Sequence, residues 1–457
     1  MRIAVFPIGR STFDLEYASE AYQKLRSILH SLGIESEFPN EILSDELATQ
    51  QFIHRLKNQD FSRILVFQAT FTDSLAVCSI AEHFNEPLSI IAVQEPRLRN
   101  RLRLNSFCGL NLASHALGLR SHPFNWLYEK PENFSKEAIL NLLTTQPTEP
   151  QLYGDSPKKK HNRVQANNLV KLNIGVIGEH PPGFDTCKFE SSDLKKIFNT
   201  TVQKISLNEL FEKAKQVNST DLIPLIAQIK EMKGAKDVNQ AELIKSLKLK
   251  IALDQLADGK DLSGFAIRCW PETFTQYGGA VCGPVSLMGD EHMPCACEAD
   301  VFGALSQLWI KHLVNEVSFL VDVVDMDVHT NSGVVWHCGQ APLSMCNPQY
   351  SPEITIHTNR QKPLLFQFPL KAGVITLFRV SQSLGQYRIV VIKAEVIDAP
   401  IPFTGTSGTI KFKQPVAEVL KEFLHQRIEH HLVLVYGDHR QKIIEFASTH
   451  NLPVIEI

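Results

Sequence analysis

The sequence HMPCACEAD at residues 292–300 places the acid Glu298 at the end of a short apolar run, directly before a predicted helix. A second acid, Asp322, follows another apolar run, VSFLV at residues 317–321. A carboxylate inside an apolar stretch costs free energy unless a partner compensates it. Two such acids in matching positions suggest a shared cation, although ordinary ion pairs at strand ends fit the pattern equally well.

The segment between these two acids predicts how they meet. Residues 299–314 carry apolar side chains at helical spacing. If this helix connects two parallel strands, Glu298 ends the first strand and Asp322 lies high on the second, at the same edge of the sheet. Because ligands bind at that edge in open α/β sheets, we expect both acids in a ligand site.

Length and composition restrict the class of protein. A chain of 457 residues is expected to form two or three domains, and 44% hydrophobic with 21% charged residues is typical of globular proteins. A net charge of −3 argues against nucleic acid as the main partner. No apolar run approaches about 18 residues, so no membrane span is predicted. The apolar start lacks a cleavage site, which favours a first strand and a cytoplasmic protein. The nine cysteines are scattered, which favours reduced thiols.

The order of the predicted elements divides the chain. Residues 1–150 alternate β-rich runs with helical patterns, which predicts βαβ units and a parallel sheet. Residues 151–168 are polar and basic without periodicity and are interpreted as a linker. Residues 169–316 predict a second α/β domain that carries Glu298. In residues 317–457 short strands punctuated by Pro and Gly predominate, which predicts a β-rich domain.

Two interpretations of a metal site are available. Carboxylates combined with imidazole suit Mn²⁺, Fe²⁺ or Co²⁺, and the candidate ligands of this kind are Glu298, Asp322 and His431, with His337 as a possible fourth. Zinc would instead use Cys295, Cys297, His337 and Cys338. The zinc interpretation lacks CxxC spacing, and free cysteines commonly pack in cores.

Several polar residues follow predicted strand ends. Arg10 lies in the loop after the first strand and is a candidate binding residue. Residues 97–103 carry four arginines at alternating positions, which could bind an anion or form a solvated face or a subunit contact. Glu272 closes another strand, where a role in the cleft and a salt-bridged surface role fit equally.

Short segments spread in order along almost the whole chain resemble the L-fucose/L-arabinose isomerase family, specifically its shorter fucose-isomerase-like branch. These segments are GRSTFD (9–14), RLNSFCGLN (103–111), GEHPPGF (178–184), CWPE (269–272), ACEAD (296–300), WHCG (336–339) and HH (430–431). The resemblance implies two Rossmann-like parallel-sheet domains followed by a β-rich, barrel-like C-terminal domain. It also implies ketol isomerase activity with a divalent ion, usually Mn²⁺.

The resemblance also implies roles for individual residues. Glu298 falls on the first metal-binding acid, which also handles the substrate proton, and Asp322 falls on the second. His431 falls on the C-terminal histidine ligand, while His337 resembles an extra ligand of the arabinose branch. The expected substrate contacts are Arg10, Asn105, Trp270 and Glu272.

Family members form trimers or hexamers in which a neighbouring N-terminal domain completes each site. This assembly would give Arg10 and residues 97–103 a role across an interface.

The sequence therefore predicts a metal-dependent aldose–ketose isomerase that acts on a monosaccharide through an enediol, with Glu298 and Asp322 as metal ligands and as the acid/base pair. A non-catalytic sugar-binding or sensory protein on the same fold is the alternative. The sugar stays open among L-fucose, arabinose, other 6-deoxy sugars and a sulfosugar with an anion at C6, which requires that the arginines reach it.

Overall fold

The computed structural model describes residues 1–147 and 170–457, so the linker predicted at residues 151–168 lies outside the described residues. The first domain contains a parallel sheet in the order β2-β1-β3-β4-β5. Its strands are β1 (Arg2–Ile8), β2 (Glu35–Glu37), β3 (Arg63–Gln68), β4 (Leu88–Val93) and β5 (Phe124–Glu129). The order reverses between β1 and β3, which is where open α/β sheets bind ligands.

Helices cover both faces of this first sheet. Helices α1 (Leu15–Ser31) and α5 (Lys136–Thr144) pack on one face, and α2 (Glu46–Leu56), α3 (Leu75–His83) and α4 (Ser106–Leu119) pack on the other. Strands β3 and β4 are buried along their whole length. Their continuous apolar runs are those of a parallel sheet that is covered on both sides.

A second parallel sheet has the order β7-β6-β8-β9. Its strands are β6 (Leu172–Ile177), β7 (Thr200–Ile205), β8 (Gly264–Ile267) and β9 (Cys295–Ala296). Helices α6 (Ser191–Phe198) and α11 (Val301–Val314) cover one face, and α7 (Leu207–Lys215), α9 (Gln240–Lys260) and α10 (Cys282–Asp290) cover the other; α8 (Ile223–Ile229) precedes α9. Strand β9 ends at Ala296, so Glu298 lies just beyond its carboxyl end.

The C-terminal part closes into an antiparallel barrel, which confirms the β-rich, barrel-like prediction. The ring runs β10-β11-β16-β15-β14-β17 and back to β10. Its strands are β10 (Phe319–Asp327), β11 (Ser332–His337), β14 (Gly373–Ser381), β15 (Arg388–Val396), β16 (Thr406–Phe412) and β17 (His431–Tyr436). The additional elements are β12 (Glu353–Thr355), β13 (Leu365–Pro369), α12 (Val416–His425), α13 (Arg440–Thr449) and β18 (Val454–Glu456).

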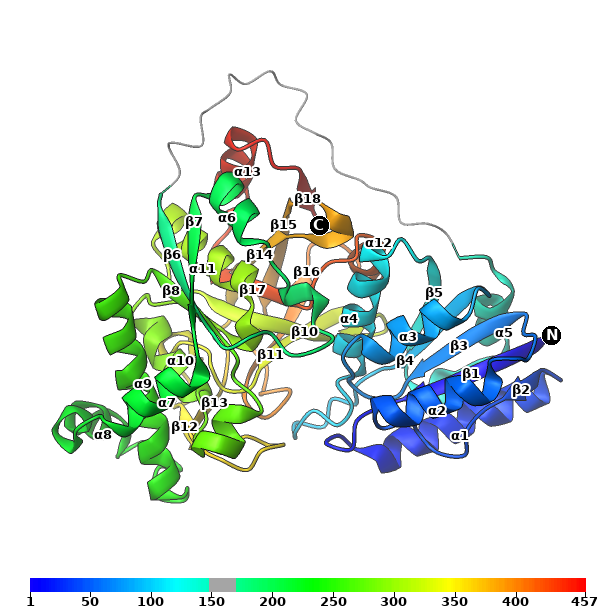
Figure 1. Cartoon of the computed structure of the whole chain (residues 1–457), viewed down its shortest axis with the longest axis horizontal. Coiled ribbons are helices and arrows are strands. Elements are labelled where there is room, and N and C mark those ends of the chain that lie inside the picture. The colour runs from blue at the N-terminus through cyan, green and yellow to red at the C-terminus, as the bar shows by residue number, and fades with distance from the viewer. Residues whose placement is uncertain (148–169) are drawn as a thin grey trace.

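The predicted connection between Glu298 and Asp322 is wrong in one respect. Strand β9 pairs with β8 in the second sheet, whereas β10 pairs antiparallel with β11 and β17 in the barrel, so the helix between them does not join two strands of one sheet. Helix α11 instead packs between the second sheet and the barrel, and its residues share one apolar cluster with both. Figure 1 shows β10 and β17 between the N-terminal sheet on the right and the second sheet on the left.

Two further observations concern cysteines and membranes. Cys269 and Cys297 form a disulfide, whereas the sequence predicted reduced thiols. The two residues follow the neighbouring strands β8 and β9, so parallel pairing brings them together. Among the described helices, none has the length and apolar character that crossing a bilayer requires.

Candidate functional site

Strand register brings the first two site residues together. In the antiparallel pair of β10 and β17, Asp322 lies directly opposite His431. Directly opposed residues share a face of the sheet, with Cβ atoms about 4.5–5.5 Å apart. As a result Asp322 Oδ1 lies 3.5 Å from His431 Nε2. Both residues are buried, with 7% and 1% of their surface exposed.

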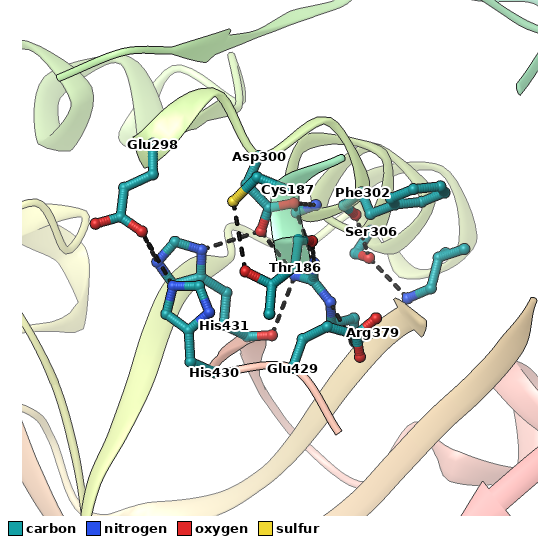
Figure 2. Close-up of polar contacts among 12 residues, drawn as sticks. Thr186, Cys187, Glu298, Asp300, Phe302, Ser306, Arg379, Glu429, His430 and His431 are labelled. Atoms are coloured by element: carbon teal, nitrogen blue, oxygen red, sulfur yellow. Dashed lines mark hydrogen bonds and ion pairs between the residues drawn. The ribbon is translucent and has the colours of Figure 1, made fainter. Parts of the chain in front are cut away.

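Glu298 reaches the same point from the second sheet. It adopts a left-handed backbone conformation (φ 60°) in the turn after β9, which is uncommon for a residue with a Cβ. Glu298 Oε2 lies 3.0 Å from His430 Nε2 and 3.7 Å from His431 Nε2. Trp270 Nε1 donates to Glu298 Oε1 over 3.1 Å, so the carboxylate is held at both oxygens. Figure 2 shows Glu298 facing the two imidazole rings.

A buried charge network orients His431. The Asp300 carboxylate accepts a hydrogen bond from His431 Nδ1 (3.0 Å) and receives two hydrogen bonds from Arg379 (2.7 and 3.1 Å). Arg379 in turn lies 3.6 Å from Glu429. The side chains of Asp300, Arg379 and Glu429 are all 0% exposed. Figure 2 shows Asp300 and Arg379 beyond the rings, on the side away from Glu298.

This orientation of His431 leaves several ligand atoms available to a cation. Because His431 Nδ1 donates to Asp300, the neutral ring has its lone pair on Nε2, which faces the carboxylates of Glu298 and Asp322. Two further buried atoms, Asp322 Oδ1 and His337 Nε2, have no hydrogen-bond partner within the described parts of the chain. Asp322, His337 and His431 each offer a ligand atom within 4.8 Å of the others. Oxygen and imidazole donors of this kind suit a divalent ion such as Mn²⁺.

The pKa values of the two facing carboxyl groups diverge. Burial raises the pKa of Glu298, but the hydrogen bond from His430 and the charges that His430 and His431 carry when protonated outweigh burial and lower it to about 2. Burial, together with the nearby charges of Glu298 and Asp300, raises the pKa of Asp322 to about 7. Carboxyl groups with separated pKa values are suited to act as a base and an acid side by side.

An open cleft leads to these groups, with an empty volume of about 690 Å³ that includes open solvent. Its lining includes Glu298, Asp322 and His337, together with three of the predicted substrate contacts, Arg10, Asn105 and Trp270. Arg10 reaches the cleft from its own chain, so its expected role across a subunit interface stays a prediction.

Other predicted residues lie elsewhere. Glu272 is not part of the cleft lining and accepts a hydrogen bond from Arg268 Nε (2.7 Å), the salt-bridged role that the sequence left open. Arg97 binds Asp325 and Ser332, and Arg103 binds Asp14. Arg97 therefore joins the N-terminal domain to the barrel, whereas Arg103 forms an ion pair within the N-terminal domain.

The alternative zinc site does not form. Cys297 is disulfide-bonded to Cys269, and Cys295 is buried in the apolar cluster beneath the second sheet. Cys297, His337 and Cys338 line the cleft, and the contact that remains among the four candidates joins His337 Nδ1 to Cys338 Sγ over 3.3 Å.

Four residues of the site escaped sequence reasoning. Asp300 stands in the quoted HMPCACEAD stretch, but there it has the signature of a helix N-cap, and its Oδ1 does accept from Gly303 N. His430 adjoins the predicted ligand His431 and gives no separate signal. Arg379 lies within an ordinary β-rich run, and Arg360, which lines the cleft, lies in an irregular loop between β12 and β13.

Known proteins resemble this chain over its length. The family model "Fucose/sulfoquinovose isomerase, N-terminal domain" matches residues 4–145, and "L-fucose isomerase, C-terminal domain" matches residues 335–457. A sulfoquinovose isomerase of Alkalicoccus urumqiensis is 31% identical over 460 aligned residues, which cover 100% of this chain and 99% of the relative. A sulfoquinovose isomerase of Priestia aryabhattai is 31% identical over 98% of this chain and 97% of the relative. One from Clostridium sp. (strain MSTE9) is 26% identical over 98% and 97%.

The similarity of this chain to solved structures is weak. An ABC sugar transporter subunit from Rhodobacter sphaeroides 2.4.1 matches 58% of this chain and 77% of its own, at 13% identity and a TM-score of 0.20.

The network behind His431 makes a testable prediction about stability. The substitution Asp300→Asn removes the charge that compensates the fully buried Arg379, so we expect the free energy of unfolding of the barrel to fall by about 3–5 kcal/mol. Urea denaturation followed by circular dichroism measures this change. The control Asp438→Asn breaks a partly exposed pair with Arg440 and should cost less than about 1 kcal/mol. Equal losses in both variants would contradict the assigned role of Asp300.

Proposed function

Because this chain belongs to the fucose/sulfoquinovose isomerase family, and is therefore a sugar aldose–ketose isomerase, we propose that its activity depends on a divalent metal held by Glu298, Asp322 and His431. His337 is a further candidate ligand. Family membership disfavours the alternative of a non-catalytic sugar-binding or sensory protein. Mn²⁺ is the metal that we expect, and other divalent ions fit the same donors.

The observation that carries this proposal is that the carboxyl groups of Glu298 and Asp322 both approach Nε2 of His431, the nitrogen that carries the lone pair of the ring. His431 Nε2 lies 3.5 Å from Asp322 and 3.7 Å from Glu298. Two largely buried carboxylates that approach the same nitrogen atom repel each other unless a positive charge compensates them. Asp300, bound to Arg379, keeps His431 in the tautomer that offers Nε2 to a metal, as carboxylates behind metal-binding histidines commonly do.

The chain's own residues then account for the isomerisation. A bound divalent ion would polarise the sugar carbonyl and stabilise the negative charge that develops on oxygen. Moving the carbonyl from C1 to C2 requires that a proton leave C2 and that a proton arrive at C1. Glu298 and Asp322 supply two carboxyl groups at the inner end of the cleft, one to accept the proton and one to return it. Trp270 and His430 hold Glu298 by hydrogen bonds, which fixes the direction in which its carboxylate acts.

The relatives' names suggest the substrate. Sulfoquinovose is a hexose with a sulfonate on C6, and a sugar of this kind is our candidate substrate for this chain. The carboxylates and the metal would handle C1 and C2, which all aldoses share, so the sulfonate must be recognised elsewhere in the cleft. We further propose a homo-oligomer, a trimer or a hexamer, in the cytoplasm.

The assigned role of Glu298 can be tested by Glu298→Gln. Glutamine keeps the shape of the side chain but accepts no proton and binds metal weakly, so we expect kcat for aldose–ketose conversion to fall by about 10²–10⁴-fold. Ketose formation from a panel of aldoses, with Mn²⁺ present, measures this loss. The matched control is Glu272→Gln, which alters a glutamate outside the cleft lining and should retain activity within about threefold. Wild-type turnover by the Glu298 variant would refute the proposal.

Removal of the metal is a separate test. Dialysis against EDTA should abolish turnover, because the developing charge would then lack its counter-ion, and added Mn²⁺ should restore it. Binding of Mn²⁺ to the stripped protein, followed by electron paramagnetic resonance, should show one site per chain that weakens at least tenfold in His431→Ala. Full activity after exhaustive chelation would show that the reaction proceeds without a metal.

A further inference from the structure

The indole of Trp270 joins the reactive end of the cleft to a pair of arginines. Its Nε1 donates to Glu298 Oε1, as described above. The guanidinium carbon of Arg10 lies 5.6 Å from the centre of the same ring, and that of Arg360 lies 5.7 Å from it. Both arginines line the cleft. Both guanidinium groups therefore lie close to the ring that holds the Glu298 carboxylate, where the far end of an open-chain hexose with C1 and C2 at Glu298 could meet them.

The two arginines differ in how their charge is compensated. Arg10 forms an ion pair with Asp73 and also lies over the ring of Phe71. Arg360 forms no ion pair with any carboxylate of residues 1–147 or 170–457, although it is half-buried. Burial and the nearby charge of Arg10 lower the pKa of Arg360. A half-buried cation beside a second cation is an unfavourable arrangement that an anion between them relieves.

We propose that Arg360, supported by Arg10, forms a binding site for an anionic group on C6 of the sugar. This inference rests on the proposed function, because that function places C1 and C2 at the carboxylates. The planar guanidinium group of Arg360 has donors free to bind two oxygens of one anion. Sulfonate and phosphate share this chemistry. The sulfonate is the form that the names of the relatives favour.

Arg360 also determines specificity in this arrangement. With a neutral aldose the charge of Arg360 stays uncompensated, so a neutral sugar gains nothing from this end of the cleft. The charge of Arg10 is already compensated in part by Asp73, so Arg10 mainly helps to position the anion. We therefore expect substitution of Arg360 to affect the binding of an anionic sugar more than substitution of Arg10 does.

The test is Arg360→Gln, assayed with sulfoquinovose and with a neutral 6-deoxy aldose. We expect KM for sulfoquinovose to rise by about 10–100-fold, the loss typical of charge-assisted hydrogen bonds, with kcat within about threefold because Arg360 makes no hydrogen bond or ion pair with Glu298 or Asp322 in the described residues. Values for the neutral aldose should stay within about threefold. Arg360→Lys keeps the charge but loses the planar, two-pronged donor group of arginine. Its KM for sulfoquinovose should lie between those of the wild type and Arg360→Gln.

The matched control is Arg26→Gln. Arg26 is also half-buried, its guanidinium carbon lies 4.1 Å from the centre of the Phe38 ring, and it lies outside the cleft. It should leave both substrates unaffected. Isothermal titration calorimetry of sulfoquinovose provides a readout that does not depend on turnover, and the wild type should bind it at least tenfold more tightly than Arg360→Gln does.

The outcomes separate the two proposals. Metal-dependent turnover of aldoses with no preference for an anion, or equal binding of sulfoquinovose by the wild type and Arg360→Gln, overturns the anion site and leaves the isomerase mechanism intact. Loss of metal dependence together with retained, Arg360-dependent binding of sulfoquinovose supports the anion site and overturns the mechanism. A tenfold preference for the 6-phosphate sugar supports the anion site but overturns sulfonate as its ligand.

Discussion

The hydrogen bond between Asp300 and His431 is the constraint on which the site depends. Asp300 is fully buried and would be costly as an isolated charge, so it requires the two hydrogen bonds from Arg379. Once Asp300 is ionised and fixed, it accepts from His431 Nδ1 and turns Nε2 toward Glu298 and Asp322. The arrangement of the cleft thus rests on a charge network that is fully buried behind the cleft lining.

Three structural units contribute residues to the cleft or to its inner end. The second parallel sheet supplies Glu298 at the end of β9, the barrel supplies Asp322 and His431 from two paired strands, and the N-terminal domain supplies Arg10 from the loop after β1. Helix α11 packs against both the second sheet and the barrel, so its apolar side chains fix the distance between Glu298 and Asp322. Apolar packing away from the cleft therefore sets the relative positions of the Glu298 and Asp322 carboxyl groups.

Much of this could be predicted from the sequence. Apolar side chains at helical spacing over residues 299–314 located helix α11 (Val301–Val314), because most of those side chains are buried. The sequence also singled out Glu298 and Asp322, because acids inside apolar runs are rare. What it could not supply was pairing: the same apolar run 317–321 fits a parallel sheet or a barrel, and only the register that places Asp322 opposite His431 decides between them. Asp300, Arg379 and Arg360 were missed for the same reason, since their partners are distant along the chain.

The position of Arg360 in the chain bears on how such an isomerase selects its sugar. The groups that we propose to act on C1 and C2 lie on strands or next to them, where a shift of one residue would turn the side chains to the opposite face. Arg360 instead lies in the irregular connection between β12 and β13, together with His357 and Asn359 of the same cleft. A loop tolerates substitution that a strand does not. Recognition of the sugar's far end can therefore change through this loop while the reactive end, held by Asp300 and by the strand pairing, stays the same.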